Sequence, residues 1–371
     1  MAQAIWLLPD ELKKARERRG LSSREAAESA GVTEELLVIW EKGGEAPTLE
    51  QAYDLARLYH SSLQRLLQPS LETPPRLDLR AQRPLELDEQ ESLIREAASQ
   101  FEHWCETAAN LEALMGPRNV RLTPRDSTDP VALAAVIRQE YNLRVTPIRN
   151  IRRLLEQDMG VLVFSLPLDG VSGMSWWHPR AGPAVLVNRN DTAGRQNWTL
   201  AHELAHLLRN DAIVICETFS GNYSEPRERF ADTFAAEFLL PREDLTRYIQ
   251  SEGLTPILAD DETLTRVARR YKASREATSR RLETLGFLAR GFTADQLPRW
   301  LEGWRQRERF RRRSSRRRQR VSQLGESLVG QAIQGYREGK ITLSKLAEDL
   351  GLGVIEAEEL AGEWQTEDWP K

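Results

Sequence analysis

The stretch LAHELAHLLRN, Leu200 to Asn210, contains the pattern H-E-x-x-H, formed by His202, Glu203 and His206. The two histidines are four residues apart, so on a helix they share one face and their ring nitrogens can converge on one ion. Zinc prefers a tetrahedral set of nitrogen and oxygen ligands, and a catalytic zinc site keeps its fourth position for water. Glu203 directly follows the first histidine and could accept a proton from that water. The pattern therefore predicts a zinc-binding helix with Glu203 as the general base.

The same stretch could form a stable helix without any metal. Leucines recur along it at helical spacing and would form an apolar stripe: Leu200, Leu204, Leu207 and Leu208. A buried amphipathic helix with two incidental histidines is therefore the alternative interpretation. The chain has only 5 histidines in 371 residues, so two of them flanking a glutamate at this spacing favour the metal site.

A third protein ligand is expected from SEPRERFADTFAAEFLLP, Ser224 to Pro241. Ser224 can cap a helix here, and phenylalanines at helical spacing supply its core face. Glu228 and Asp232 lie four residues apart on a different face. One carboxylate can then ligate the metal while the other accepts the outer ring N–H of a zinc histidine. We assign the ligand to Glu228 and the histidine contact to Asp232, with a solvated face of an ordinary helix as the alternative.

These stretches resemble a known family. The runs AVLVNRNDTAGRQNWTLAHELAHLL, Ala184 to Leu208, and ERFADTFAAEFLLP, Glu228 to Pro241, look like metallopeptidases of the ImmA/IrrE type. The resemblance extends over roughly Pro130 to Leu288. It implies a small sheet, a helix that carries HExxH and a second helix whose glutamate completes the zinc site, and it favours Glu228 over the other glutamates nearby. It also implies a specific endopeptidase that acts on a regulatory protein.

The composition limits the class of protein. With 371 residues, 40% hydrophobic and 29% charged, the chain should fold into two to four domains. It has no apolar run of about 18 residues and no signal-peptide pattern, so we expect a cytoplasmic protein without a membrane span. Its two cysteines, Cys105 and Cys216, form neither a disulfide framework nor a C-x-x-C metal site. The net charge of -4 does not by itself indicate a nucleic-acid partner.

Residues 1–70 have the pattern of a compact helical bundle. Apolar residues recur at helical spacing in four segments that glycine-containing turns separate. Ser22 or Ser23 can begin one helix and Thr33 the next, an arrangement similar to the Xre type of helix-turn-helix. This resemblance implies that the second of these helices binds the major groove of DNA.

The chemistry of that second helix argues against base recognition. Glu34, Glu35, Val38 and Ile39 occupy positions where Arg, Lys, Asn, Gln or Ser would contact bases or phosphates. Residues 1–70 carry 9 Lys and Arg against 11 Asp and Glu, so few counterions would be released on binding DNA. DNA therefore stays one of two candidate partners, and a helix-turn-helix that dimerises or docks another protein is the alternative.

The middle of the chain divides into a connecting region and a catalytic one. Residues 71–128 are interpreted as a Pro-rich linker followed by a long helix, and residues 129–290 as the metallopeptidase domain. Short β-rich runs at 160–164, 170–177 and 184–187, each bounded by Gly or Pro, predict a small antiparallel sheet. Trp176, Trp177 and His178 either line a cleft in which a substrate strand adds to the sheet edge or simply cover the sheet.

Residues 291–371 are predicted to be a basic and helical C-terminal region. The run RQRERFRRRSSRRRQR, Arg305 to Arg320, contains ten arginines and one glutamate. It could bind DNA or RNA phosphates without specificity, or dock on an acidic partner. After it, Gly325 to Leu360 again resembles a helix-turn-helix, and its acidic second helix favours protein docking. The candidate nucleic-acid-binding residues are Arg311, Arg312, Arg313, Arg316, Arg317 and Arg318.

Together these patterns predict a predominantly α-helical α+β protein, in which a small antiparallel sheet and the zinc-site helices are flanked by helix-turn-helix bundles. We predict a zinc-dependent endopeptidase that cleaves one partner protein, of repressor or toxin type, to control transcription or a stress or defence response. The alternative is a non-enzymatic Xre-type antitoxin or transcriptional regulator that binds DNA and sequesters a partner, with a structural or sensing zinc site. Under either interpretation, the protein could form a homodimer.

Overall fold

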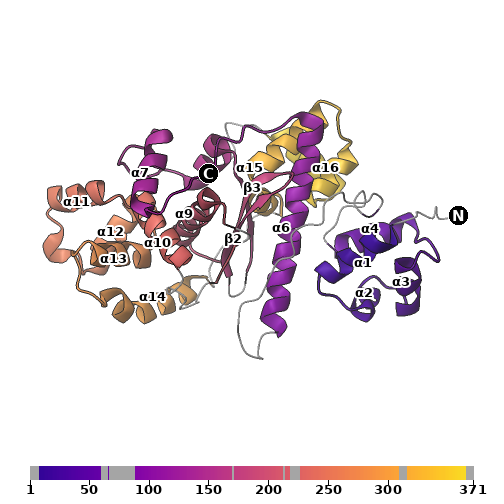
Figure 1. Cartoon of the computed structure of the whole chain (residues 1–371), viewed down its shortest axis with the longest axis horizontal. Helices are drawn as coiled ribbons and strands as arrows, with labels where there is room; N and C mark the ends of the chain where they lie inside the picture. Colours follow the sequence, from indigo (N-terminus) through magenta and orange to yellow (C-terminus); the bar gives the residue numbers. More distant parts are fainter. Residues whose placement is uncertain are drawn as a thin grey trace. The chain divides into compact units, whose positions relative to one another are not determined.

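The computed structural model describes residues 8–59, 66, 88–168, 171–211, 214–217, 226–308 and 316–364. The chain divides into two compact units, Met1–Asn110 and Leu111–Lys371. Figure 1 shows that helices make up most of the described chain and that the strands lie in one region of the second unit. This confirms the predicted predominantly α-helical α+β class.

The first unit begins with a helical bundle, to which four helices of the described residues contribute. Its core is apolar and includes Leu12, Leu37, Trp40 and Leu55, all buried. The buried guanidinium of Arg16 donates to both carboxylate oxygens of Glu41, at 2.6 and 2.9 Å, and so ties the first helix to the third. The helices are α1 (Pro9–Arg18), α2 (Ser23–Ser29), α3 (Glu34–Glu41) and α4 (Leu49–Leu58), and α6 (Asp88–Met115) continues from this unit into the second.

The turn between α2 and α3 is defined by its caps. Ser22 begins α2 with a capping box, in which its hydroxyl accepts from the Glu25 N–H and its own N–H donates to the Glu25 carboxylate. Gly31 has a φ of 67°, which allows the chain to turn sharply before Thr33 caps α3. The sequence prediction of a helix-turn-helix bundle in this region is therefore confirmed.

The second unit surrounds its sheet with helices. None of the helices in the described part of the chain is long and apolar enough to cross a lipid bilayer. The helical elements are α7 (Pro130–Glu140), α8 (Ile151–Arg153), η1 (Leu154–Met159), α9 (Ala193–Arg209), α10 (Pro226–Leu239), α11 (Arg242–Ser251), η2 (Thr255–Ile257), α12 (Asp261–Tyr271), α13 (Arg275–Thr284), α14 (Phe292–Glu308), α15 (Arg316–Arg337), α16 (Leu343–Leu350) and α17 (Val354–Glu363).

The sheet is mixed, whereas an antiparallel one was predicted. Its strands are β1 (Leu162–Leu166), β2 (Val171–His178), β3 (Gly182–Asn188) and β4 (Val214–Glu217), in the order β1-β3-β2-β4. β2 pairs antiparallel with both β3 and β4, but β1 pairs parallel with β3. β3 and β4 pair with the two sides of β2, so β1 can pair only with the other side of β3. Since the chain reverses both before and after β2, β1 and β3 run the same way.

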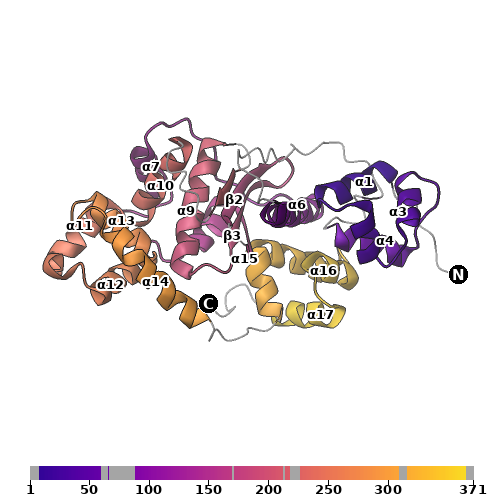
Figure 2. The ribbon, with the colours of Figure 1, turned by 90° about the horizontal axis from the view of Figure 1, so that it is seen from below.

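Helices cover the sheet and one of its edges. Figure 2 shows α9 along β2 and β3, with α10 beyond α9. At one edge of the sheet, α15 contacts β1, where the Ser165 hydroxyl donates to the Ser322 carbonyl at 2.8 Å. One large apolar core joins β1, β3, α7, α9, α10 and the helices from α11 to α14. The helix that carries the HExxH pattern is therefore held between the sheet and α10.

A buried carboxyl lies where α15 meets β1. Burial raises the pKa of Glu156 to about 7, although Arg152 lies 3.7 Å away and opposes this shift. Gly325 interrupts the helical backbone of α15 at this point, with a φ of 80°. A Cβ atom at Gly325 would lie 2.2 Å from a Glu156 carboxylate oxygen and 2.7 Å from the Val163 carbonyl oxygen, so only glycine permits this close approach.

Candidate metal centre

α9 is a long helix, exposed or half-buried in its first third and buried from Thr199 to Leu208. It begins at Thr192, whose side chain accepts a hydrogen bond from the Arg195 N–H, and it ends at Asn210, which has a left-handed backbone. Every residue from Thr199 to Leu208 is buried. His202 and His206 are 8% and 1% exposed, so both imidazoles are removed from bulk water. Ionisable side chains at such depth need polar partners.

The two imidazoles converge on one carboxylate. The Nε2 atoms of His202 and His206 are 3.1 Å apart. Glu228, in the first turn of α10, places Oε2 3.2 Å from Nε2 of His202 and Oε1 3.7 Å from Nε2 of His206. These three side chains form a group that could hold a metal ion, since their ligand atoms all lie within 4.8 Å of one another. The structure thus brings together the three residues that we predicted as ligands.

A second carboxylate orients each imidazole from behind. Nδ1–H of His202 donates to Asp232 Oδ1 at 3.0 Å, and Nδ1–H of His206 donates to Asp211 Oδ2 at 2.8 Å. A neutral imidazole that is protonated at Nδ1 keeps its Nε2 lone pair for a metal, so these two contacts favour the tautomer that a metal ligand needs. Asp232 was predicted for this role from the sequence, whereas Asp211 was missed.

Asp211 reaches His206 because of how α9 ends. The left-handed Asn210, with φ of 53°, folds the chain back, and the Asp211 N–H donates to the His206 carbonyl. The Asp211 carboxylate then lies beside the ring of the same histidine. The sequence contained one signal for this contact, an Asn-Asp pair directly after the helix, because Asn is one of the few residues that adopt the left-handed conformation at a helix C-terminus.

Glu228 is held in its ionised form. Burial alone would raise the pKa of Glu228, but contacts with His202 and His206 outweigh it and hold the pKa well below its usual range. Arg227 lies 3.6 Å from the same carboxylate. An ionised carboxylate between two imidazoles is the state that a cation would select.

The packing of α10 against α9 places Glu228. Phe230, Phe234 and Phe238 are buried, and the rings of the last two stack with centroids 5.3 Å apart. Ala231 and Ala235 have no exposed surface, so their small side chains allow α10 to approach its neighbours closely. Ser224, the predicted cap of this helix, lies outside the described residues.

Glu203 lies beside the ligands but points at the sheet. Its side chain has no exposed surface, and its Oε2 accepts a hydrogen bond from the Ser175 hydroxyl of β2 at 2.6 Å. Its other oxygen, Oε1, is buried and has no hydrogen-bond partner among the described residues. The carboxylate is therefore anchored at one oxygen only. Ser175 is a further site residue that sequence reasoning missed.

The tryptophans of β2 belong to the sheet packing. β2 lies between β3 and β4, so it is not an edge strand along its length from Val171 to Ser175. Trp176 is 8% exposed and its ring contacts His178 edge-on, with centroids 4.4 Å apart. The indole N–H of Trp177 donates to the Leu207 carbonyl of α9 at 2.8 Å. These contacts agree with the interpretation that the aromatic side chains cover the sheet.

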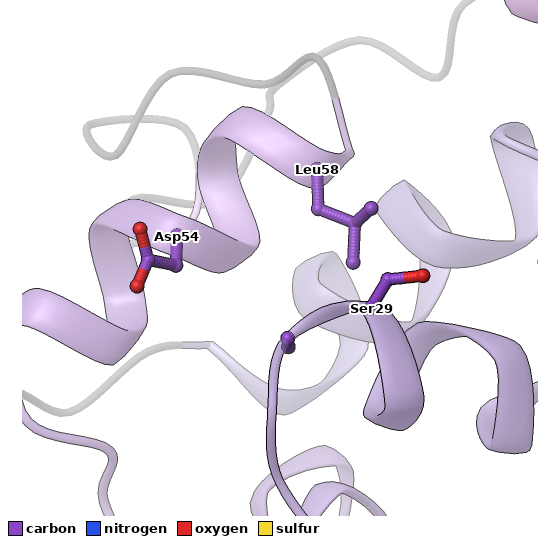
Figure 3. A pocket seen from close by; sticks show the side chains of 4 residues that line it. Ser29, Asp54 and Leu58 are labelled. Carbon is purple, nitrogen blue, oxygen red and sulfur yellow. The ribbon is translucent and has the colours of Figure 1, made fainter.

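The candidate DNA-binding surfaces lack a comparable cluster in the described residues. Glu34 and Glu35 are exposed at the start of α3, and Ile39 is 37% exposed on the same helix. A surface hollow of about 460 Å³ lies between α2 and α4 and is lined by Ser29, Ala30, Asp54 and Leu58. Figure 3 shows three of these side chains, Ser29, Asp54 and Leu58. The single carboxylate and hydroxyl of this hollow do not select a ligand.

The basic run lies mostly outside what can be described. Arg311, Arg312 and Arg313 lie outside the described residues, and Arg316, Arg317 and Arg318 form the first turn of α15. Their assignment to nucleic-acid binding therefore stays a prediction.

Two family models match parts of the chain. Residues 156–283 match the IrrE N-terminal-like domain of the M78 peptidases, and residues 12–66 match a helix-turn-helix family. The first match contains the whole candidate metal centre, and the second begins within α1 and includes α2, α3 and α4. Both resemblances that we inferred from the sequence are thereby confirmed. None of the curated proteins matches this chain.

Proposed function

We propose that this chain, with its IrrE N-terminal-like peptidase domain and its helix-turn-helix domain, is a zinc-dependent endopeptidase that cleaves one regulatory protein. The observation that carries the proposal is the convergence of His202, His206 and Glu228 next to the buried Glu203. Two imidazoles and one carboxylate are a ligand set of catalytic zinc sites, which leave the fourth position open.

The spacing of the ligand atoms supports zinc. Ligands at ~2.0–2.1 Å from a tetrahedral zinc ion are ~3.3 Å from one another. The separations among His202, His206 and Glu228 are 3.1, 3.2 and 3.7 Å, close to that value. Calcium and magnesium prefer oxygen ligands throughout, so the two imidazoles disfavour them.

In this proposal Glu203 transfers the proton during hydrolysis, and Asp232 and Asp211 orient the ligand histidines. When bound, zinc would polarise the scissile carbonyl and activate a water molecule. Glu203 takes the proton from that water and later delivers it to the nitrogen of the leaving amine, as a general base and then a general acid. Asp232 and Asp211 keep His202 and His206 in the tautomer that leaves Nε2 free.

We further propose that the substrate is a repressor-type or toxin-type protein, recognised away from the cleaved bond. An unselective protease would damage its own cell, so the chain needs a second point of recognition. Two helices with exposed glutamates support docking of a protein at a second point. These residues are Glu34 and Glu35 on α3, and Glu358 and Glu359 on α17. The segment near the cleaved bond would pair with β4, because α15 covers the opposite edge strand, β1.

The test is to incubate the zinc-loaded protein with each protein encoded beside it and with casein. We expect one neighbour to be cut, and casein to be cut at least ~100-fold more slowly if docking provides the selectivity. Glu203→Gln should abolish cleavage while Glu243→Gln, an exposed control on α11, should not. Rapid digestion of casein would contradict the specificity. A neighbour that binds wild type and Glu203→Gln equally, without being cut, would favour the non-enzymatic, sequestering regulator.

A further inference from the structure

We propose that Ser175 is a positioning residue for Glu203, whose hydroxyl keeps the carboxylate in the orientation that proton transfer requires. This inference rests on the proposed function, because it concerns the general base of that reaction. Ser175 comes from β2, 28 residues before Glu203 in the chain, and it contacts none of the three predicted metal ligands in the hydrogen bonds of the described residues.

The contact between the two side chains is short and enclosed. The Ser175 hydroxyl donates to Glu203 Oε2 at 2.6 Å, and the two residues are 2% and 0% exposed. Hydrogen bonds to an ionised acceptor are shorter and stronger than neutral ones, and water cannot replace this one at such depth. The contact leaves Oε1 as the oxygen without a partner among the described residues, and so as the oxygen available to a proton.

The backbone of β2 is in register with α9 on both sides of this contact. Two residues along a strand advance ~6.7 Å and four residues along a helix ~6 Å, so alternate strand residues can meet successive helix turns. Gly173 meets Thr199 and Glu203, Ser175 meets Glu203, and Trp177 donates to the Leu207 carbonyl. Gly173, Ser175 and Trp177 therefore lie on the face of β2 that contacts α9, and this places the Ser175 hydroxyl beside the Glu203 carboxylate.

Gly173 restricts the carboxylate from the neighbouring position. A Cβ atom at Gly173 would lie 2.5 Å from Thr199 Cγ2 and 2.8 Å from Glu203 Oε1. The strand therefore approaches α9 as closely as a missing side chain allows, and Oε1 lies against this backbone. With Oε2 bound by Ser175 and Oε1 beside Gly173, the carboxylate plane has little freedom to rotate. Loss of the hydroxyl would release one of these two restraints.

The consequence is specific to the general base. Ser175→Ala should leave the metal in place, since the imidazoles are oriented by Asp232 and Asp211. It should weaken only the interactions that need Glu203 in its correct orientation. A purely structural serine would instead lower the stability of the fold without affecting Glu203.

The experiment measures binding of acetohydroxamate to the full-length protein loaded with Co²⁺, followed by visible absorption. A hydroxamate chelates the metal and also donates a hydrogen bond to a carboxylate beside it. Ser175→Ala should weaken its binding ~10-fold, the cost of a misplaced hydrogen bond to a charged group. Ser175→Thr, which restores the hydroxyl, should bind within ~3-fold of wild type, and bound metal should be unchanged in both variants.

The matched control is Ser165→Ala. Ser165 is another buried strand serine, 1% exposed, but it lies on β1 and donates to the Ser322 carbonyl of α15, not to Glu203. Its loss should leave hydroxamate binding unchanged even if thermal stability falls. Glu203→Gln should weaken binding at least as much as Ser175→Ala, and the double variant no more than Glu203→Gln alone, because both act through one carboxylate.

The outcomes separate two kinds of failure. If Glu203→Gln weakens hydroxamate binding but Ser175→Ala does not, the positioning role is wrong and the proposed function stands. Full additivity of the two substitutions would also overturn the positioning role. If Glu203→Gln itself has no effect, Glu203 does not face the metal, and the proposed function fails with it.

Discussion

The metal centre and the helix-turn-helix bundle use their acidic residues in opposite ways. In the metal centre Asp211, Glu228 and Asp232 contact imidazoles, and Glu203 accepts from a serine. In the bundle, exposed glutamates stand at the start of α3, where an operator-binding protein would present base-reading side chains. Both regions match their family models. The matches agree with the fold of each region, and in the candidate metal centre His202, His206 and Glu228 also form a group that could hold a metal ion.

The bundle keeps the contacts that hold its helices together. Arg16 and Glu41 join α1 to α3, and the capping box of Ser22 begins α2. That same capping box fills the N-terminus of α2 with the carboxylate of Glu25, whose pKa is lowered by its hydrogen bonds from Ser22. A helix N-terminus is where DNA phosphates commonly bind, and an occupied one does not attract them. The carboxylates of Glu25, Glu34 and Glu35 thus make this unit a poor binder of phosphates, although its fold is that of a helix-turn-helix.

The largest expected effect would test whether the metal centre is the chemically complete region. His206→Ala or Glu228→Ala should reduce bound zinc from ~1 per chain to less than ~0.1 after dialysis, because two ligands hold zinc far more weakly than three. Elemental analysis of the purified variants measures this. Glu203→Gln should keep its zinc, because Glu203 contacts Ser175 and not the ligands. An equal loss of zinc in the Gln variant would show that the roles are wrongly assigned.

A smaller effect is expected from the carboxylates behind the imidazoles. Asp232→Asn and Asp211→Asn should each weaken zinc binding ~10 to 100-fold, measured by competition with a chelator, because each imidazole loses the partner that fixes its tautomer. Since they act on different histidines, the effects should roughly multiply in the double variant. Glu243→Gln serves as an exposed acidic control. If Asp211→Asn binds zinc like wild type, Asp211 does not orient His206 in the way that Asp232 orients His202.

The smallest effect concerns DNA binding and tests the helix-turn-helix bundle. The full chain should bind duplex DNA weakly, with an affinity that falls steeply with salt and is lost when Arg311, Arg312 and Arg313 are replaced by Gln. Replacing Glu34 and Glu35 by Gln should strengthen binding only ~2 to 5-fold, since it removes repulsion without creating base contacts. Electrophoretic mobility shift at several salt concentrations measures both. Tight binding of one operator that Lys42→Gln abolishes would show that α3 does read DNA.

Much of the candidate metal centre could be predicted from the sequence because its parts are local. His202, Glu203 and His206 lie within two turns of one helix, so their relation follows from helical geometry alone. Glu228 and Asp232 are likewise one turn apart on α10. Their spacing suggested Glu228 as the third ligand, and the family resemblance favoured it over the other glutamates nearby, because no local rule says which helix packs on which. Three strands were also expected close to where β1, β2 and β3 lie.

The sequence by itself thus determined which side chains share a helical face, since the 3.6-residue period acts over short distances. Only the tertiary structure decided that β1 pairs parallel with β3, that Asp211 folds back onto His206, and that Ser175 meets Glu203. These contacts depend on strand order, on a left-handed turn at Asn210 and on the register between β2 and α9. The physical reason is that packing selects such arrangements by shape and burial over the whole domain, and no local period of the sequence encodes that selection.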